Sequence, residues 1–133
     1  MPNSILILHA TDATETAKQL QKMFSDERIF SLTYHEILLQ GHLIIPELVA
    51  ASAGVVIVLS PRLLEDSICT VIAQHALNVS KGICVLMEDT YVPEWAIKPF
   101  NLEPGEMFEV NWGFLMTKLR SLINFSELRE EPS

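Results

Sequence analysis

The sequence contains only two cysteines and nine lysine or arginine residues, and each scarcity excludes a class of function. Cys69 and Cys84 stand in separate apolar stretches, without a CxxC motif or a Cys/His cluster, so no metal site is expected. We predict that both are buried and reduced, as is usual in an intracellular protein. The 17 acidic residues give a formal net charge of -8, whereas nucleic-acid binding requires clustered basic residues. We therefore expect no nucleic-acid partner.

Long apolar segments are also missing. No stretch approaches the roughly 20 apolar residues that a membrane-spanning helix requires, and the N-terminus lacks the pattern of a secretory signal. We therefore predict a cytoplasmic location without direct insertion into a membrane. The chain has 133 residues, enough for one domain with a hydrophobic core. Residues 1–125 are assigned to this domain, and the polar residues 126–133 are expected to begin a linker.

The clearest pattern in the sequence is that of buried β-strands. Residues 54–59 are uniformly apolar and rich in β-branched side chains, which is typical of a central strand in a parallel sheet covered on both faces. Further strands are predicted at residues 4–9, 29–34, 82–87 and 107–110. Amphipathic spacing and capping residues predict helices at residues 13–24, 46–51, 68–77 and 112–125. This alternation predicts an α/β fold, a flavodoxin-like five-stranded parallel sheet in the order 2-1-3-4-5 with helices on both faces.

The predicted ligand crevice contains no known catalytic or phosphate-binding motif. In this strand order, ligands bind beyond the carboxyl ends of the first and third strands, which residues 9–12 and 60–62 follow here. Neither turn carries a glycine-rich phosphate loop, Ser60 does not stand in GxSxG, and we interpret Asp12 as a helix cap. We expect His9 and His75 to be partly buried and bonded to backbone groups. No catalytic residue, cofactor or metal is therefore predicted.

One cluster of apolar residues is less easily explained as part of the hydrophobic core. Three large apolar residues stand beside a glycine and are flanked by polar residues. If this segment projects, it offers a hot spot for a protein partner; if it folds back, its apolar residues are packing. The candidate interface consists of His35, Glu36, Ile37, Leu38, Leu39, Gln40, Gly41 and His42.

The order of these features resembles a Toll/interleukin-1 receptor (TIR) domain over nearly the whole chain. The residues that carry the resemblance are 5–10, the loop ending at Gly41, 55–64, Cys69, and Trp112-Gly113-Phe114. The resemblance implies that residues 35–42 correspond to the BB loop of that family, although its usual proline is missing. It also implies that Trp112 and Phe114 correspond to box three. The chain is most similar to cytosolic signalling adaptors, either the TIR adaptors or the BCAP, BANK and Dof group.

The resemblance implies a non-enzymatic intracellular adaptor in immune or receptor signalling. Its expected partners are itself, other TIR domains and receptor-proximal signalling proteins. TIR domains that cleave NAD carry a glutamate on the helix after the third strand, and the matching position here is Ile72. The alternative, an NAD-cleaving hydrolase, requires Glu65 as a displaced acid, with Thr11, Asp12 and Ser60 around the nucleotide.

Overall fold

A five-stranded parallel sheet forms the centre of the molecule. The computed structural model describes residues 4–38 and 45–130. The strands are β1 (Ile5–Leu8), β2 (Ser31–Thr33), β3 (Gly54–Val58), β4 (Gly82–Leu86) and β5 (Phe100–Asn101). Their order is β2-β1-β3-β4-β5, and every pairing is parallel. The predicted fold class and strand order are therefore confirmed.

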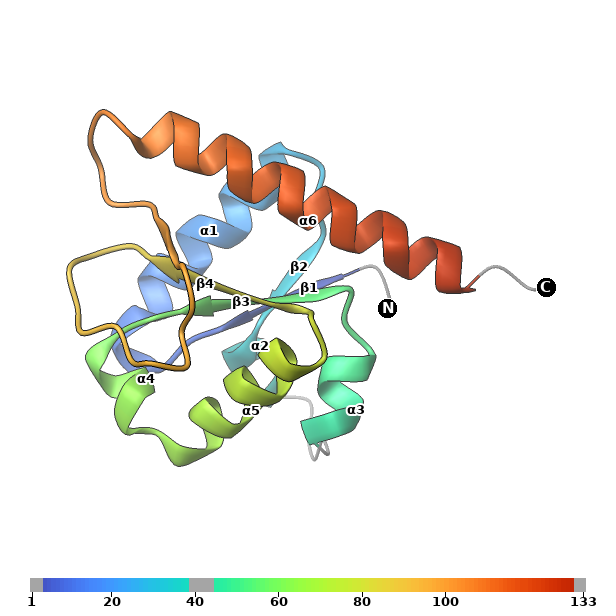
Figure 1. Ribbon diagram of the computed structural model, residues 1–133, viewed down its shortest axis with the longest axis horizontal. Coiled ribbons are helices and arrows are strands. Elements are labelled where there is room, and N and C mark those ends of the chain that lie inside the picture. Colours follow the sequence, from blue (N-terminus) through green and yellow to red (C-terminus); the bar gives the residue numbers. More distant parts are fainter. Residues whose placement is uncertain (1–3, 39–44, 131–133) are drawn as a thin grey trace.

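Helices cover both faces of this sheet, because side chains alternate along each strand. Ile5 and Ile7 of β1 belong to one core, and Leu6 and Leu8 belong to the other. The first core is covered by α1 (Thr14–Asp26), which follows a 3-10 turn η1 (Thr11–Ala13), and by α6 (Phe108–Glu130). The second is covered by α2 (Tyr34–Leu38), α3 (Ile45–Ala50), α4 (Pro61–Glu65) and α5 (Ser67–Asn78). Figure 1 shows the two layers above and below the strands.

The fifth strand was predicted at residues 107–110, and this prediction is wrong. The strand that pairs with β4 is β5, whose Phe100 lies opposite Val85. Residues 108–110 instead begin α6, where Phe108 stacks on Trp112 one helical turn later, at 6.0 Å between ring centroids. The last helix therefore begins at Phe108, one turn before the predicted start at residue 112.

The C-terminal helix is also longer than predicted at its other end. It continues to Glu130, past the predicted end at residue 125, and Figure 1 shows this end projecting beyond the sheet. Leu115 and Leu119 face the core, whereas Phe114 is 61% exposed. The division between a domain and a linker at residue 126 stays a prediction. Within the described residues, no helix is long and apolar enough to cross a membrane.

The two cysteines are buried and free, as predicted. Cys84 lies in the middle of β4, and Cys69 lies in the first turns of α5. Burial raises the pKa of each thiol to about 12, so both are neutral thiols at physiological pH. Their role in the described structure is therefore to fill the second core.

Candidate functional site

The turns that follow β1 and β3 are joined by Asp12. The Ser60 hydroxyl donates to Asp12 Oδ1 at 2.7 Å, and the backbone N–H of Arg62 donates to Asp12 Oδ2 at 3.1 Å. Ser60 Oγ also accepts from the backbone N–H of Leu63 at 3.3 Å, which caps α4. We call Asp12, Ser60 and Arg62 the Asp12 corner. The interpretation of Asp12 as a cap of its own helix is wrong, because its carboxylate binds the first turn of α4.

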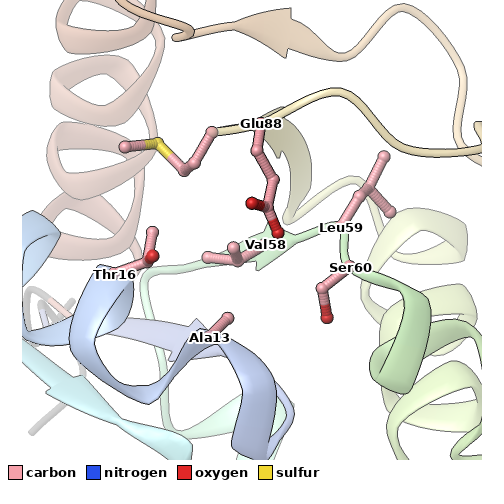
Figure 2. Close-up of a pocket in the computed structure, with 7 residues that line it drawn as sticks. Ala13, Thr16, Val58, Leu59, Ser60 and Glu88 are labelled. Carbon is pink, nitrogen blue, oxygen red and sulfur yellow. The ribbon is translucent and has the colours of Figure 1, made fainter.

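A small cavity beside the Asp12 corner lies at the carboxyl end of β3. Figure 2 shows the Glu88 carboxylate extending over Val58, with the Ser60 hydroxyl turned away from it. The cavity has a volume of about 40 Å³, which holds a few water molecules. Its lining consists of Ala13, Thr16, Val58, Leu59, Ser60, Met87 and Glu88. Nucleotides bind at this point of the sheet in doubly wound folds, and the cavity here is far smaller than the roughly 300 Å³ or more of a typical ligand pocket.

A second pocket lies on the other side of the β1 end and is larger. Its volume is about 100 Å³; it is open to solvent and bordered by the end of β1, η1, the start of α1, α2 and the start of α5. We call it the His9 pocket, and its lining residues are His9, Ala10, Thr11, Thr14, Tyr34, His35, Leu38, Asp66 and Cys69. Two of the predicted interface residues, His35 and Leu38, thus meet His9 and Asp66 around one space.

His9 is only 3% exposed and has one unsatisfied ring nitrogen. Its Nδ1 lies 2.9 Å from the carbonyl oxygen of Ala10. Since a carbonyl oxygen only accepts, the proton belongs on Nδ1, and Nε2 carries a lone pair that has no partner. Burial lowers the pKa of His9, and the nearby His35 lowers it further. The predicted bond to backbone is thus confirmed at Nδ1, while Nε2 keeps an unused acceptor.

Asp66 supplies the negative charge of the His9 pocket. Its Oδ1 accepts from the backbone N–H groups of Ile68 and Cys69, both at 3.0 Å, and so caps α5. Burial, followed by the charge of Asp66 and a side-chain hydrogen bond to Asp66, raises the pKa of Cys69. Burial is also the main cause that raises the pKa of Tyr34, with Cys69 and Asp66 adding to it. Burial is thus the main cause of these pKa shifts, and the charge of Asp66 adds to it.

The predicted interface segment is divided by the structure. Residues 35–38 belong to helix α2, in which Ile37 is buried in the second core and Leu38 is 56% exposed. Ile37 is thus packing, because α2 turns its side chain towards the sheet, and this is the second of the two alternatives that the sequence left open. Leu39, Gln40, Gly41 and His42 lie outside the described residues.

The start of α2 carries a reciprocal cap that the sequence analysis missed. The backbone N–H of Glu36 donates to Thr33 Oγ1 at 3.3 Å, and the backbone N–H of Thr33 donates to Glu36 Oε2 at 2.9 Å. The signal was present as Thr-x-x-Glu, the capping-box pattern that precedes a helix. The side chain of Gln21 on α1 donates to the same carboxylate and to the carbonyl of Ser31. These contacts hold α2 against the edge strand β2.

The two residues matched to box three have different surroundings. Trp112 stacks on Phe24 with 5.6 Å between ring centroids, and its Nε1–H donates to Glu27 Oε2 at 3.1 Å. Arg120 pairs with Glu27 at 3.5 Å, so these contacts fasten α6 to the end of α1. Trp112 is therefore a packing residue, whereas Phe114 is on the exposed side of α6.

The residues of the NAD-cleavage alternative are not gathered around one cavity. Ile72, at the position of the expected glutamate, is 1% exposed and packed in the second core. Glu65 is exposed at the end of α4 and is not among the described residues that line the His9 pocket. Asp12 and Ser60 are bonded to each other in the Asp12 corner. Among the described residues, no three His, Cys, Asp or Glu side chains are grouped as a metal ion would require.

Comparison with solved structures identifies the fold. Protein-family models and curated protein sequences give no match. The TIR domain of the Toll-related receptor TRR-2 of Hydra magnipapillata matches with a TM-score of 0.78 and 18% identity, over 90% of this chain and 99% of that domain. A TIR-STING receptor from C. gigas matches with a TM-score of 0.58 and 14% identity, over 97% of this chain and 40% of the receptor. The chain therefore has the fold of a TIR domain.

Proposed function

We propose that this chain is a non-enzymatic signalling domain that acts inside the cell by associating with other TIR domains and with further copies of itself. The observation that carries the proposal is the exposed Leu38 at the end of a fixed helix. The capping box of Thr33 and Glu36, together with Gln21, holds α2 in place, so Leu38 is presented to solvent on a rigid element. An exposed apolar residue of this kind is suited to anchor a protein partner.

Two observations favour a binding role over NAD cleavage. Ile72 offers no carboxylate and is enclosed in the core, so a cation that develops as nicotinamide leaves would gain no stabilisation from this position. The Asp12 carboxylate occupies the first turn of α4, and its negative charge disfavours a nucleotide phosphate there. The wider partnership, with receptor-proximal proteins in immune or receptor signalling, belongs to the same proposal.

The test of self-association is light scattering over a concentration series. We expect the apparent mass of the wild-type chain to rise with concentration and that of Leu38→Glu to remain monomeric. The matched control is Val110→Glu, which adds the same charge at an exposed apolar residue of α6, in the other helix layer. Circular dichroism checks that each variant remains folded. A wild-type chain that stays monomeric at every concentration would overturn the homotypic part of the proposal.

The non-enzymatic part is tested by incubating the chain with NAD and measuring nicotinamide release by chromatography. We expect no release above the buffer control. Release that disappears in Glu65→Ala would show that the alternative, a hydrolase with a displaced acid, is correct. The Glu65→Ala variant is suitable because the side chain is exposed at the end of α4, so its truncation leaves the core unchanged.

A further inference from the structure

The chain has two tyrosines, and the structure places them in opposite environments. Tyr34 belongs to α2, where it is partly buried against the second core, and this burial raises the pKa of its hydroxyl. Tyr91 is 71% exposed, and no hydrogen bond or aromatic ring pair joins it to another of the described residues. The fold therefore packs one tyrosine and leaves the hydroxyl of the other in solvent.

Tyr91 lies in the segment between β4 and β5, which packing holds at its two ends. Met87 packs against the first core, and Trp95 and Ala96 pack in the second. Between these anchors, residues 88–92 make no backbone–backbone hydrogen bond within the described chain. Figure 1 shows the segment as a wide loop beyond the end of β4. This stretch can therefore be drawn into an extended conformation without unfolding of the sheet.

The residues on either side of Tyr91 form a pattern that protein tyrosine kinases accept. Glu88 and Asp89 stand before it, and Val92 follows it directly. The side chains of all three are exposed. Such kinases bind their substrates as extended segments, and many prefer acidic side chains before the tyrosine and an apolar one after it. Access to a kinase therefore requires no rearrangement of a helix or strand.

We propose that Tyr91 is a phosphorylation site for a protein tyrosine kinase, and that its phosphate stays in solvent for a partner that supplies arginine side chains. In the reaction, the phenolic oxygen of Tyr91 forms a bond to the γ-phosphorus of ATP, and the bond from that phosphorus to the β–γ bridging oxygen breaks. The phenolic proton passes to the base of the kinase, and ADP leaves. The domain thus gains a kinase-controlled contact that does not depend on Leu38.

The charges around Tyr91 indicate that the phosphate serves a partner and not a contact within the chain. No lysine or arginine occurs between residues 82 and 97, whereas Glu88, Asp89 and Glu94 do. Phosphorylation adds a charge of about -1.5 to -2, which these carboxylates repel towards solvent. The net charge of -8 acts in the same direction. The positive charge must therefore come from a partner, and arginine provides it with two parallel hydrogen bonds to phosphate.

The first experiment measures phosphate transfer to the folded chain. The chain is incubated with ATP, Mg²⁺ and the catalytic domain of a cytosolic tyrosine kinase that is active on a glutamate–tyrosine copolymer. Intact mass and peptide mapping follow the product, and we expect one phosphate per chain, on Tyr91. Tyr91→Phe should lower the initial rate by roughly tenfold or more, and the matched control Tyr34→Phe should change it less than about twofold.

Two double variants with the same loss of charge test the acidic residues before Tyr91. Glu88→Gln with Asp89→Asn removes both of them. Glu106→Gln with Glu109→Gln removes two exposed carboxylates around the beginning of α6. We expect the first pair to lower kcat/KM of the kinase by roughly threefold or more, and the second to change it less than about 1.5-fold.

A phosphorus-31 titration of the phosphorylated chain shows where the phosphate lies. Free phosphotyrosine is titrated beside it as the reference. We expect the second pKa of the attached phosphate to lie at or above that of the reference, because nearby carboxylates disfavour the dianion. A phosphate paired with a lysine or arginine of the chain itself would instead have a lower pKa than the reference.

Four results would overturn the inference. The first is no transfer to the folded chain by a kinase that labels the copolymer, and the second is equal labelling of Tyr34 and Tyr91, which indicates action on unfolded chains. The third is an equal loss of kcat/KM in both double variants, and the fourth is a phosphate pKa below that of free phosphotyrosine. All four are measured on the monomer, so they are independent of the self-association that Leu38→Glu tests.

Discussion

The Asp12 corner and the His9 pocket lie on either side of the end of β1, and they use similar residues in opposite ways. Each contains an aspartate at the beginning of a helix. Both oxygens of Asp12 accept hydrogen bonds, from Ser60 and Arg62. At Asp66 both cap bonds fall on Oδ1, and His9 Nε2 nearby has no partner at all. The first place is thus closed by its own bonds, whereas in the second Asp66 caps a helix and His9 Nε2 is a buried acceptor without a partner.

This difference shows that the Asp12 corner has a structural role, because both oxygens of its carboxylate are used within the protein. Hydrogen bonds made within the protein stabilise the fold and remove groups that a ligand could use. An acceptor that stays buried without a partner costs stability, and such sites tend to be functional. The position where doubly wound proteins bind nucleotides is here the closed one. The His9 pocket lies beside α2, the helix that presents Leu38.

The largest change in the free energy of unfolding should come from Ser60→Ala, which breaks the Asp12 corner. This change removes the buried hydroxyl that donates to Asp12 and caps α4, so we expect the free energy of unfolding to fall by about 2 kcal/mol. Urea unfolding followed by circular dichroism measures the change. The control is Thr70→Ala, which removes an exposed hydroxyl bond on α5 and should alter stability by less than about 0.5 kcal/mol. Equal losses in both variants would show that the corner adds no particular stability.

A smaller loss of stability is expected when the pH is lowered, and we attribute it to His9. The pKa of His9 is lowered in the folded chain by burial and by His35, while the Ala10 carbonyl, Asp12 and Glu36 act in the opposite direction. As pH falls through the unfolded value of 6.5, the unfolded chain binds a proton that the folded chain resists, so stability decreases below that pH. The decrease should be complete once the pH is below the folded pKa.

The measurement is the free energy of unfolding at a series of pH values between 7.5 and 5. In His9→Gln the slope over this range should be shallower than in the wild type, whatever the stability of the variant at neutral pH. His75→Gln serves as the control, because it leaves His9 and its surroundings in place and should retain the wild-type slope. A His9→Gln slope equal to that of the wild type would assign the acid response to other groups.

The sheet could be predicted where the physical signal is local. The strands β1, β3 and β4 are buried on both faces, so their residues are apolar without alternation, and the sequence alone identifies them. The two-residue strand β5 could not be found in this way. Its pairing with β4 depends on how the long segment from residue 87 returns to the sheet, and the largely apolar residues 107–110 gave a stronger local signal.

The candidate site was predictable only in part. His35 and Leu38 were identified from the apolar cluster, but the pattern could not tell which of its apolar residues project and which pack, and Ile37 packs in the second core while Leu38 is exposed. The Thr33 and Glu36 capping box was a local signal that predicts this helix. The bond between Asp12 and Ser60 joins residues 48 apart in the sequence, so it required the tertiary fold.

The smallest effect on stability should come from Asp66→Asn. This substitution tests whether Asp66, unlike Asp12, can lose its charge without a loss of stability. Asparagine accepts from the N–H groups of Ile68 and Cys69 as aspartate does, so the free energy of unfolding should change by less than about 0.5 kcal/mol. Asp66→Ala loses the cap as well and should cost about 1 kcal/mol. Urea unfolding of both variants separates the two roles of the residue. A loss in Asp66→Asn as large as that in Asp66→Ala would mean that the charge itself holds α5, and Asp66 would then be committed to the fold in the same way as Asp12.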